Sequence, residues 1–172
     1  MTEAVIREVT EEDLPALIEI SRETFADTFG ADNSDEDMEK FLDESYSKEK
    51  LGGELANPGS TFYFLLADGQ VAGYLKINTG DAQSEDVDPN GLEIERIYLR
   101  RSFQHKGLGS RLFDFAEEKA RELDKSVLWL GVWEHNENAK SFYAHHGLTR
   151  FSEHVFVVGD DRQTDYLMKK SL

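Results

Sequence analysis

The chain has 172 residues, no cysteine and a formal net charge of −16 at pH 7. This length fits a single domain over residues 1–172, which would bury roughly 70% of the surface that the unfolded chain exposes. Without cysteine, disulfides, a thiolate nucleophile and cysteine-ligated metal sites are excluded. The acidity disfavours nucleic acid and favours a cationic small molecule as partner, although solubility explains most of the carboxylates equally well.

The sequence shows neither the pattern of a signal peptide nor that of a membrane-spanning helix. The chain does not open on a basic stretch followed by an apolar one, and no apolar run approaches about 18 residues. We therefore expect a cytoplasmic protein that does not bind membranes. The five histidines show no metal-ligand spacing, so no metal site is expected.

The first third of the chain predicts one strand followed by helices. Ala4 to Val9 alternates as a strand does, and Thr10 can cap a helix whose apolar stripe runs from Leu14 to Phe25. A second helix is predicted after Ser34, and a third, short one ends before Pro58.

The remaining pattern predicts strands first and then alternating helices and strands. The expected elements are two strands over Thr61–Ala67 and Val71–Asn78, a surface loop over Thr79–Gly91, a strand over Leu92–Leu99, a helix over Lys106–Leu123, a strand over Val127–Val132, a helix over Asn136–His146, and two strands over Arg150–Val158 and Thr164–Lys169 joined by a turn at 159–162. The order predicts an α/β fold with a mixed, twisted sheet and helices on both faces.

The loop Gln104 to Gly109 stands between a predicted strand and a predicted helix. Its two glycines let the backbone approach an anion, and the first N–H groups of the helix point toward that anion. The spacing Q-x-x-G-x-G matches neither the Rossmann nor the Walker pattern. A pyrophosphate site is therefore predicted, and a plain Gly-rich turn remains the alternative.

Two further motifs accompany this loop in the expected order. The strand LEIERIYL (Leu92 to Leu99) precedes it, and N-x-x-A-x-x-x-Y (Asn136 to Tyr143), closing on Gly147, follows it. With these three motifs the chain resembles the GNAT superfamily of N-acetyltransferases, whose cofactor is acetyl-CoA. The resemblance implies a sheet of about seven strands, splayed between the strands Leu92–Leu99 and Val127–Val132.

Shorter strings resemble one branch of this family. DAQSE (Asp81 to Glu85), WLGVWE and QTD (Gln163 to Asp165) look like the bacterial PaiA-like enzymes, which acetylate spermidine and spermine. The resemblance implies acetyl transfer to a primary amine by direct attack through a tetrahedral intermediate. Rival acceptors are a protein N-terminus, a lysine or an aminoglycoside, and a rival class is an acyl-CoA-binding regulator with little catalysis.

The resemblance also implies which residues contact the cofactor. Backbone groups of the splayed strand would pair with pantetheine, the loop would hold the pyrophosphate, two arginines could pair with the 3′-phosphate, and the later helix would add side chains. The implied residues are Ile97, Tyr98, Leu99, Arg100, Arg101, Gln104, His105, Lys106, Gly107, Leu108, Gly109, Ser110, Asn136, Asn138, Ser141 and Tyr143. As alternatives, the cations are solvated surface charges and the two asparagines are helix caps.

Tyr143 is the predicted general acid. Its phenol has an ordinary pKa near 10, which is comparable to that of the departing CoA thiolate, so proton transfer between them is nearly matched. The alternative is an aromatic ring that only packs on the sheet.

Glu93 and Glu95 are the candidate bases, because the amine must lose a proton before it attacks. Alternation along the strand predicts both on one face, beside a water-filled cleft. By the same alternation, that face also carries Ile97 and Leu99, while Arg96 and Tyr98 point the other way. We expect a water-relayed base, with Glu93 slightly favoured; the alternative for Glu95 is a salt bridge to a neighbouring cation.

Acidic segments are candidates to hold a polyamine. Several exposed carboxylates together can focus potential over a cleft, although each alone contributes little. The candidates are Asp27, Asp32, Asp35, Glu36, Asp37, Asp81, Glu85, Asp86 and Asp88. A homodimer is an open alternative to a monomer.

Overall fold

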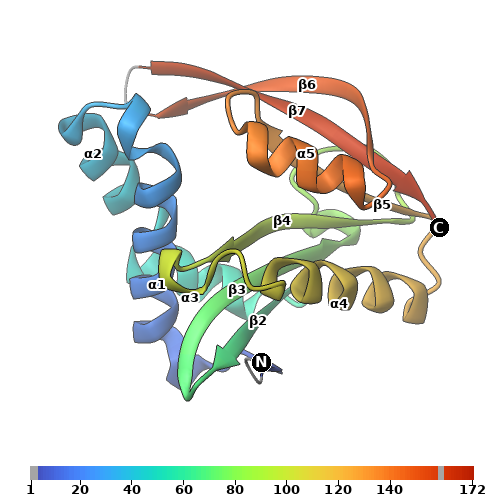
Figure 1. The fold of residues 1–172 in the computed structure, drawn as a ribbon, viewed down its shortest axis with the longest axis horizontal. Coiled ribbons are helices and arrows are strands. Elements are labelled where there is room, and N and C mark those ends of the chain that lie inside the picture. Colours follow the sequence, from blue (N-terminus) through green and yellow to red (C-terminus); the bar gives the residue numbers. More distant parts are fainter. Residues whose placement is uncertain (1–3, 159–160) are drawn as a thin grey trace.

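The computed structural model describes residues 4–158 and 161–172, which form one seven-stranded mixed sheet with helices on both faces (Figure 1). The strands are β1 (Ala4–Glu8), β2 (Ser60–Ala67), β3 (Gln70–Thr79), β4 (Gly91–Leu99), β5 (Val127–Trp133), β6 (Thr149–Val158) and β7 (Asp161–Ser171), in the sheet order β1-β2-β3-β4-β5-β7-β6. The helices are α1 (Leu14–Phe29), α2 (Asp35–Ser45), α3 (Lys48–Ala56), α4 (Leu108–Glu122) and α5 (Glu137–His145). This architecture confirms the predicted α/β fold. Within the described residues, no helix has both the length and the apolar character needed to cross a membrane.

Two hydrophobic clusters lie on opposite faces of the sheet. On one face, α4 and α5 contribute residues such as Leu112 and Tyr143 to a cluster with β3, β4 and β5. On the other face, α1, α2 and α3 contribute residues such as Leu17, Leu42 and Leu51 to a cluster with β2 and β3. The central strands therefore meet a different set of helices on each side.

Ser34 caps α2 as the sequence predicts, whereas α1 begins after Asp13 without a side-chain cap, because a short turn separates it from Thr10. The backbone N and Oγ1 of Thr10 donate to Asp13 Oδ2 at 2.9 and 3.1 Å in the short turn that leads into α1. Ser34 Oγ accepts from the backbone N of Asp37 at 3.1 Å at the start of α2. These bonds satisfy polar groups that a helix end otherwise leaves unpaired.

Several element boundaries differ from the prediction, and the differences at α4 and β7 bear on the site. The helix α4 begins at Leu108, later than expected, because Gly107 has a left-handed backbone with φ of 78° and forms its N-cap. The strand β7 begins at Asp161 rather than Thr164 and continues its ladder with β6. Residues 159 and 160 of the expected turn at 159–162 lie outside the described residues.

The central strands β4 and β5 are paired over only part of their length. Parallel pairing joins Gly91–Ile94 to Val127–Leu130. Beyond these residues β4 continues to Leu99 and pairs only with β3, while β5 continues to Trp133 along β7. The backbone of β4 facing β5 is therefore left open after Ile94, as the splay implied by the family resemblance requires.

A β-bulge at Glu95 changes the faces of the β4 side chains. Ile77 on β3 lies opposite Ile94, and the preceding Lys76 lies opposite Arg96, so Glu95 is the extra residue. The expectation from simple alternation is thus wrong beyond this point. Tyr98 packs with the hydrophobic cluster on the α1 side of the sheet, whereas Ile97 and Leu99 pack with the cluster on the α4 side. The bulge places Glu93, Glu95 and Arg96 together on the α1 side.

Candidate active site

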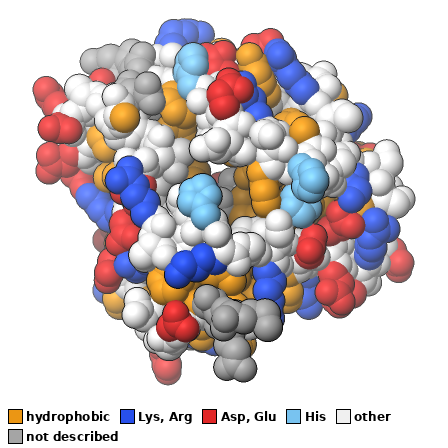
Figure 2. Space-filling model, in the orientation of Figure 1, with side chains coloured by type: hydrophobic (Ala, Val, Ile, Leu, Met, Phe, Trp, Pro, Cys, Tyr) orange, Lys and Arg blue, Asp and Glu red, His pale blue; other side chains and the backbone are white. Residues whose placement is uncertain are grey.

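A cleft of about 960 Å³ opens where β4 and β5 part. Its walls come from α1 and the diverging strands, from the loop before α4, and from α5. The space-filling view shows hydrophobic side chains in a hollow near the centre of one face, and acidic side chains gathered at the edge over α2 (Figure 2). The cleft thus joins the two faces of the sheet at the point where the strands separate.

The loop before α4 has the backbone of an anion-binding turn. His105 and Gly107 have φ values of 63° and 78°, and α4 begins directly after them. The first N–H groups of a helix have no partner within the helix and carry the positive end of its dipole. A Cβ on Gly109 would lie 3.7 Å from Leu99 Cδ1 and 3.8 Å from Phe142 Cζ, so a branched side chain there would crowd the cleft. The loop therefore has the features of a phosphate site.

Most of the expected cofactor residues line this cleft. Those that do are Ile97, Tyr98, Leu99, Arg101, Gln104, His105, Gly107, Gly109, Ser110, Asn136, Asn138 and Tyr143. Two of these residues also form hydrogen bonds within the protein. Gln104 Nε2 donates to the carbonyl of Leu99 at 3.1 Å, and Ser110 Oγ lies 3.2 Å from His146 Nε2. The structure therefore gathers three sequence motifs around one cavity.

Four expected cofactor residues lie outside the lining. Arg100 is turned toward α1, where its Nη1 lies 2.9 Å from Glu23 Oε1. Lys106 Nζ lies 5.7 Å from the centre of the Phe103 ring. The remaining two are Leu108, which is buried, and Ser141, which is exposed. Arg100 lies outside the lining because its guanidinium pairs with Glu23 on α1.

Asn136 acts as a helix cap. Its Oδ1 accepts from the backbone N of Ala139 at 3.2 Å at the start of α5. The capping alternative for this residue is observed, and the side chain also lines the cleft, where cofactor contact was predicted. Both roles are compatible, because a capping oxygen leaves the amide nitrogen free to donate.

Tyr143 reaches the cleft from a buried position on α5. The residue is 8% exposed, and its ring centre lies 6.2 Å from that of Phe113 and 5.5 Å from that of Phe142. Burial raises the pKa of the Tyr143 phenol well above its ordinary value of 10.0. The hydroxyl therefore carries its proton throughout the physiological pH range.

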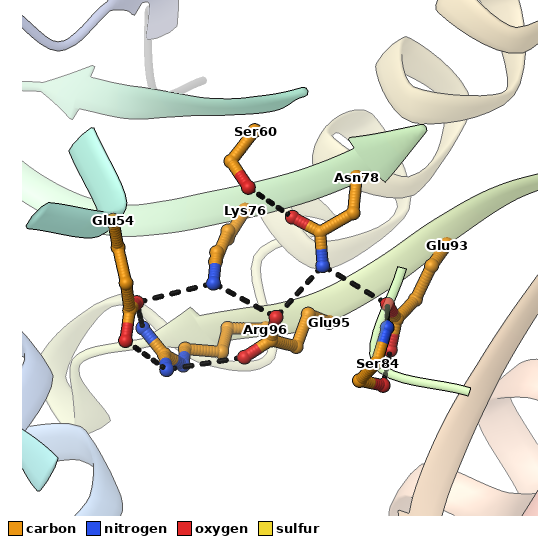
Figure 3. A network of polar contacts seen from close by, with 8 residues as sticks. All are labelled: Glu54, Ser60, Lys76, Asn78, Ser84, Glu93, Glu95 and Arg96. Carbon is orange, nitrogen blue, oxygen red and sulfur yellow. Dashed lines mark hydrogen bonds and ion pairs between the residues drawn. The ribbon is translucent and has the colours of Figure 1, made fainter. Parts of the chain in front are cut away.

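Glu95 lines the cleft and is held by two cations (Figure 3). Its Oε1 accepts from Lys76 Nζ at 2.8 Å and from Asn78 Nδ2 at 2.7 Å, and its Oε2 lies 3.1 Å from Arg96 Nη2. Burial alone would raise the pKa of Glu95, but Arg96 and Lys76 outweigh it and hold the pKa below its ordinary value. The salt-bridge alternative for Glu95 is observed, and the carboxylate is a fixed negative charge.

Glu93 lies beside this network and is not itself among the residues that line the cleft. It is 3% exposed, accepts from Ser84 N at 2.7 Å and Asn78 Nδ2 at 2.9 Å, and also accepts from the Ser84 hydroxyl (Figure 3). Burial raises the pKa of Glu93, and the hydrogen bonds from Ser84 and Asn78 offset only part of this effect. Of the two glutamates, Glu93 has the higher pKa and is therefore the better proton acceptor, whereas Glu95 lines the cleft directly.

Sequence reasoning missed an aromatic wall and one carboxylate of the cleft. The aromatic residues that this wall adds to the expected Tyr98 are Phe25, Phe29, Phe41, Tyr46 and Trp133. The carboxylate is Asp165 on β7, which stands opposite Trp133 on β5. The string QTD contained Asp165, but the lone acidic residue in a strand gave no signal that it faces a cavity.

Few of the acidic residues expected to hold a cation are in the lining. Asp27 is among the lining residues, and its Oδ1 lies 3.7 Å from Arg101 Nε. The first turn of α2 carries Asp35 and Glu36, which are exposed, and Asp37, which is half-buried; none of them lines the cleft. The side chain of Asp32 lies outside the described residues. The negative charge within the cleft comes from Asp27, Glu95 and Asp165.

Comparison with known sequences identifies one family. The model of the Acetyltransferase (GNAT) family matches residues 14–148. An uncharacterized N-acetyltransferase of the pepI 3′ region of Lactobacillus delbrueckii subsp. lactis is 73% identical over 172 residues, covering 100% of this chain and 99% of that protein. Spermidine N(1)-acetyltransferase of Thermoplasma acidophilum is 30% identical over 171 residues, covering 96% of this chain and 95% of that protein.

Solved structures share the fold. The PaiA N-acetyltransferase from Thermoplasma acidophilum, in complex with coenzyme A, has a TM-score of 0.80 and 28% identity over 99% of both chains. The ribosomal-protein-S18-alanine N-acetyltransferase from Escherichia coli has a TM-score of 0.73 at 17% identity, covering 98% of this chain and 94% of that one. The second likeness concerns the fold alone.

Proposed function

Because the chain belongs to the acetyltransferase (GNAT) family of acetyl-CoA-dependent N-acetyltransferases, we propose that it acetylates a primary amine of a polyamine such as spermidine or spermine. The observation that carries this proposal is the composition of the cleft between β4 and β5. A phosphate-binding helix start lies at one side, and carboxylates among aromatic rings lie at the other. The 30% identical spermidine N(1)-acetyltransferase supports the same class of acceptor.

The residues on the α4 side fit coenzyme A. The open backbone of Ile97–Leu99 would pair with the amide groups of the cofactor, and the turn at Gly107 would hold the pyrophosphate against the start of α4. Asn136 and Ser110 would add polar contacts at the rim. When bound, acetyl-CoA supplies a thioester that an amine can attack.

The residues on the α1 side fit a polyamine. A polyamine alternates ammonium groups with short methylene chains, so it needs both negative charge and apolar surface. Glu95 and Asp165 supply carboxylates, and rings such as Trp133 and Phe29 supply surfaces that bind methylenes and attract ammonium groups. A carboxylate shared between two cations, as Glu95 is, keeps its charge at every physiological pH.

Two proton transfers are assigned to residues of this chain. We assign Glu93 as the group that receives the amine proton through water, because its raised pKa makes it a better base than Glu95. We assign Tyr143 as the group that gives a proton to the departing sulfur, because its phenol is protonated and lines the cleft. Glu95 then has an electrostatic role, attracting the ammonium group before it loses its proton.

The test is a panel of amines assayed for CoA release from acetyl-CoA. The panel holds spermidine, spermine, an alkyl monoamine of similar length, a peptide with a free N-terminus and an aminoglycoside. Spermidine and spermine are expected to give the highest kcat/KM. A monoamine equal to spermidine, or a peptide or aminoglycoside with a higher kcat/KM, would overturn the polyamine assignment. Acetyl-CoA binding without turnover of any amine would favour a regulatory protein instead.

A further inference from the structure

Asp165 projects a carboxylate into the cleft from the centre of β7. It stands between Trp133 on β5 and His154 on β6, and its side chain is 22% exposed. Within the described chain, its one charged contact is His154 Nε2, which lies 3.8 Å from Oδ2, and no hydrogen bond reaches the carboxylate. Asp165 is therefore a partly buried anion with free acceptor capacity.

The space beside this carboxylate is kept open by a glycine. Gly131 on β5 also lines the cleft, and a Cβ added there would lie 3.4 Å from Asp165 Oδ2. Any larger side chain would fill the volume next to the carboxylate. A small polar group of a ligand can thus approach Asp165 from the direction of β4.

Burial and two charged neighbours together set the pKa of Asp165. Burial raises its pKa to about 6, the charge of His154 lowers it, and the charge of Glu85 raises it. Glu85 stands behind the histidine, with its Oε1 3.3 Å from His154 Nδ1. The facing residues of β5, Gly131 and Trp133, carry no charge. The carboxylate thus changes charge close to neutral pH.

Asp165 and the phosphate loop lie on opposite faces of the sheet. The loop, α4 and α5 lie on one face of the sheet, whereas Asp165 shares the other face with Trp133 and the aromatic cluster of α1. A cofactor held at the phosphate loop and extending through the gap between β4 and β5 would therefore meet the acceptor near Asp165. The carboxylate is on the side where an ammonium group would arrive.

We propose, resting on the polyamine function above, that Asp165 binds an ammonium group of the acceptor in the cleft and that His154 and Glu85 tune the charge with which it does so. Asp165 is then a specificity-determining residue for cationic acceptors. Its carboxylate accepts hydrogen bonds from the ammonium group, while the neighbouring Trp133 ring contacts the methylene chain.

The experiment compares steady-state kinetics of Asp165→Asn with those of Asp68→Asn. Both variants lose one carboxylate, but Asp68 is exposed in the turn between β2 and β3 and is not part of the cleft lining. Asp165→Asn is expected to raise KM for spermidine roughly tenfold or more, with kcat changed less and KM for acetyl-CoA unchanged. Asp68→Asn is expected to leave all three near their wild-type values.

The pH dependence of KM gives a readout that a structural role would not move. In the wild type, KM for spermidine is expected to rise as the pH falls through about 6, because the carboxylate becomes protonated. His154→Gln removes a charge that favours the carboxylate, so this rise moves to higher pH. Glu85→Gln removes a charge that disfavours it, so the rise moves to lower pH. Asp165→Asn abolishes the step.

The outcomes separate this inference from the proposed function. An unchanged KM in a folded Asp165→Asn variant, or shifts of the same sign in the two neighbours' variants, would overturn the inference while the polyamine function stands. If Asp165→Asn does not fold, the opposite shifts of His154→Gln and Glu85→Gln decide alone. Should the wild type bind spermidine without acetylating it, the proposed function fails, and calorimetric affinities of Asp165→Asn and Asp68→Asn decide the inference. A wild type that neither binds nor acetylates spermidine overturns both.

Discussion

Replacing Tyr143 by Phe isolates one oxygen atom of the cleft. The ring would keep its contacts with Phe113 and Phe142. Among the described residues the hydroxyl has no hydrogen-bond partner, so its removal leaves no other polar group unpaired. The free energy of unfolding is therefore expected to change by less than about 1 kcal/mol.

The effect of Tyr143→Phe on catalysis is expected to be much larger. A positioned proton donor contributes about 10²- to 10⁴-fold in rate, which equals about 3–5 kcal/mol of transition-state stabilisation. Turnover of acetyl-CoA with a saturating amine should fall by this factor, whereas CoA affinity, measured by calorimetry, should stay within about twofold. The structure places no other protonated phenol of comparable burial on the α5 side of the cleft within its described residues.

A matched variant separates the loss of a proton donor from the loss of any buried phenol. Tyr63 is 9% exposed, packs against Phe115 at 4.8 Å between ring centres, and lies outside the cleft lining. Tyr63→Phe should leave turnover unchanged. If Tyr143→Phe retained turnover within about threefold of the wild type, water or another group would be the proton donor, and the assignment of Tyr143 would be refuted.

Three further predictions concern the cofactor, the base and the acceptor. Gly109→Val should weaken CoA binding in a folded protein, because the branched side chain would crowd Leu99 and Phe142; unchanged affinity in calorimetry would contradict the phosphate site. The raised pKa of Glu93 places the acid limb of kcat, measured at saturating spermidine, above the ordinary value of a glutamate, and Glu93→Gln should remove this limb while Glu95→Gln retains it. A pH profile unaltered by Glu93→Gln would exclude that residue as the base. Raising salt from low to several hundred millimolar should raise KM for spermidine with little change in kcat, since the Debye length shrinks from about 10 Å toward a few ångströms; a salt-independent KM would argue against Coulombic binding.

The sequence was sufficient where local chemistry decides the structure. The turn before α4 needed a glycine with positive φ, and Gly107 supplies it with a φ of 78°. Asn136 was identifiable as a cap because asparagine is a preferred first residue of helices. The turn before α4, the start of α5 and the position of Tyr143 in the cleft were therefore predictable from short motifs with fixed spacing.

The sequence was insufficient where distant strands decide the structure. Asp165 faces the cleft only because β7 pairs with β5 in a register that sets it opposite Trp133. No local pattern encodes that pairing. The same limitation applies to Glu93, whose carboxylate is covered by Ser84 from the loop before β4, and this contact depends on how that loop folds back over the sheet.

The bulge at Glu95 connects the fold of the sheet to the chemistry of the cleft. It follows directly after Ile94, the last residue of β4 that pairs with β5. A bulge bends its strand and increases the local twist, which favours the separation of β4 from β5. The extra residue also turns Arg96 to the α1 side, where it pairs with both Glu95 and Glu54. One inserted residue thus favours the separation of the strands and assembles the charge network on the α1 side, so the proposed cofactor and acceptor sites are linked through the backbone of β4.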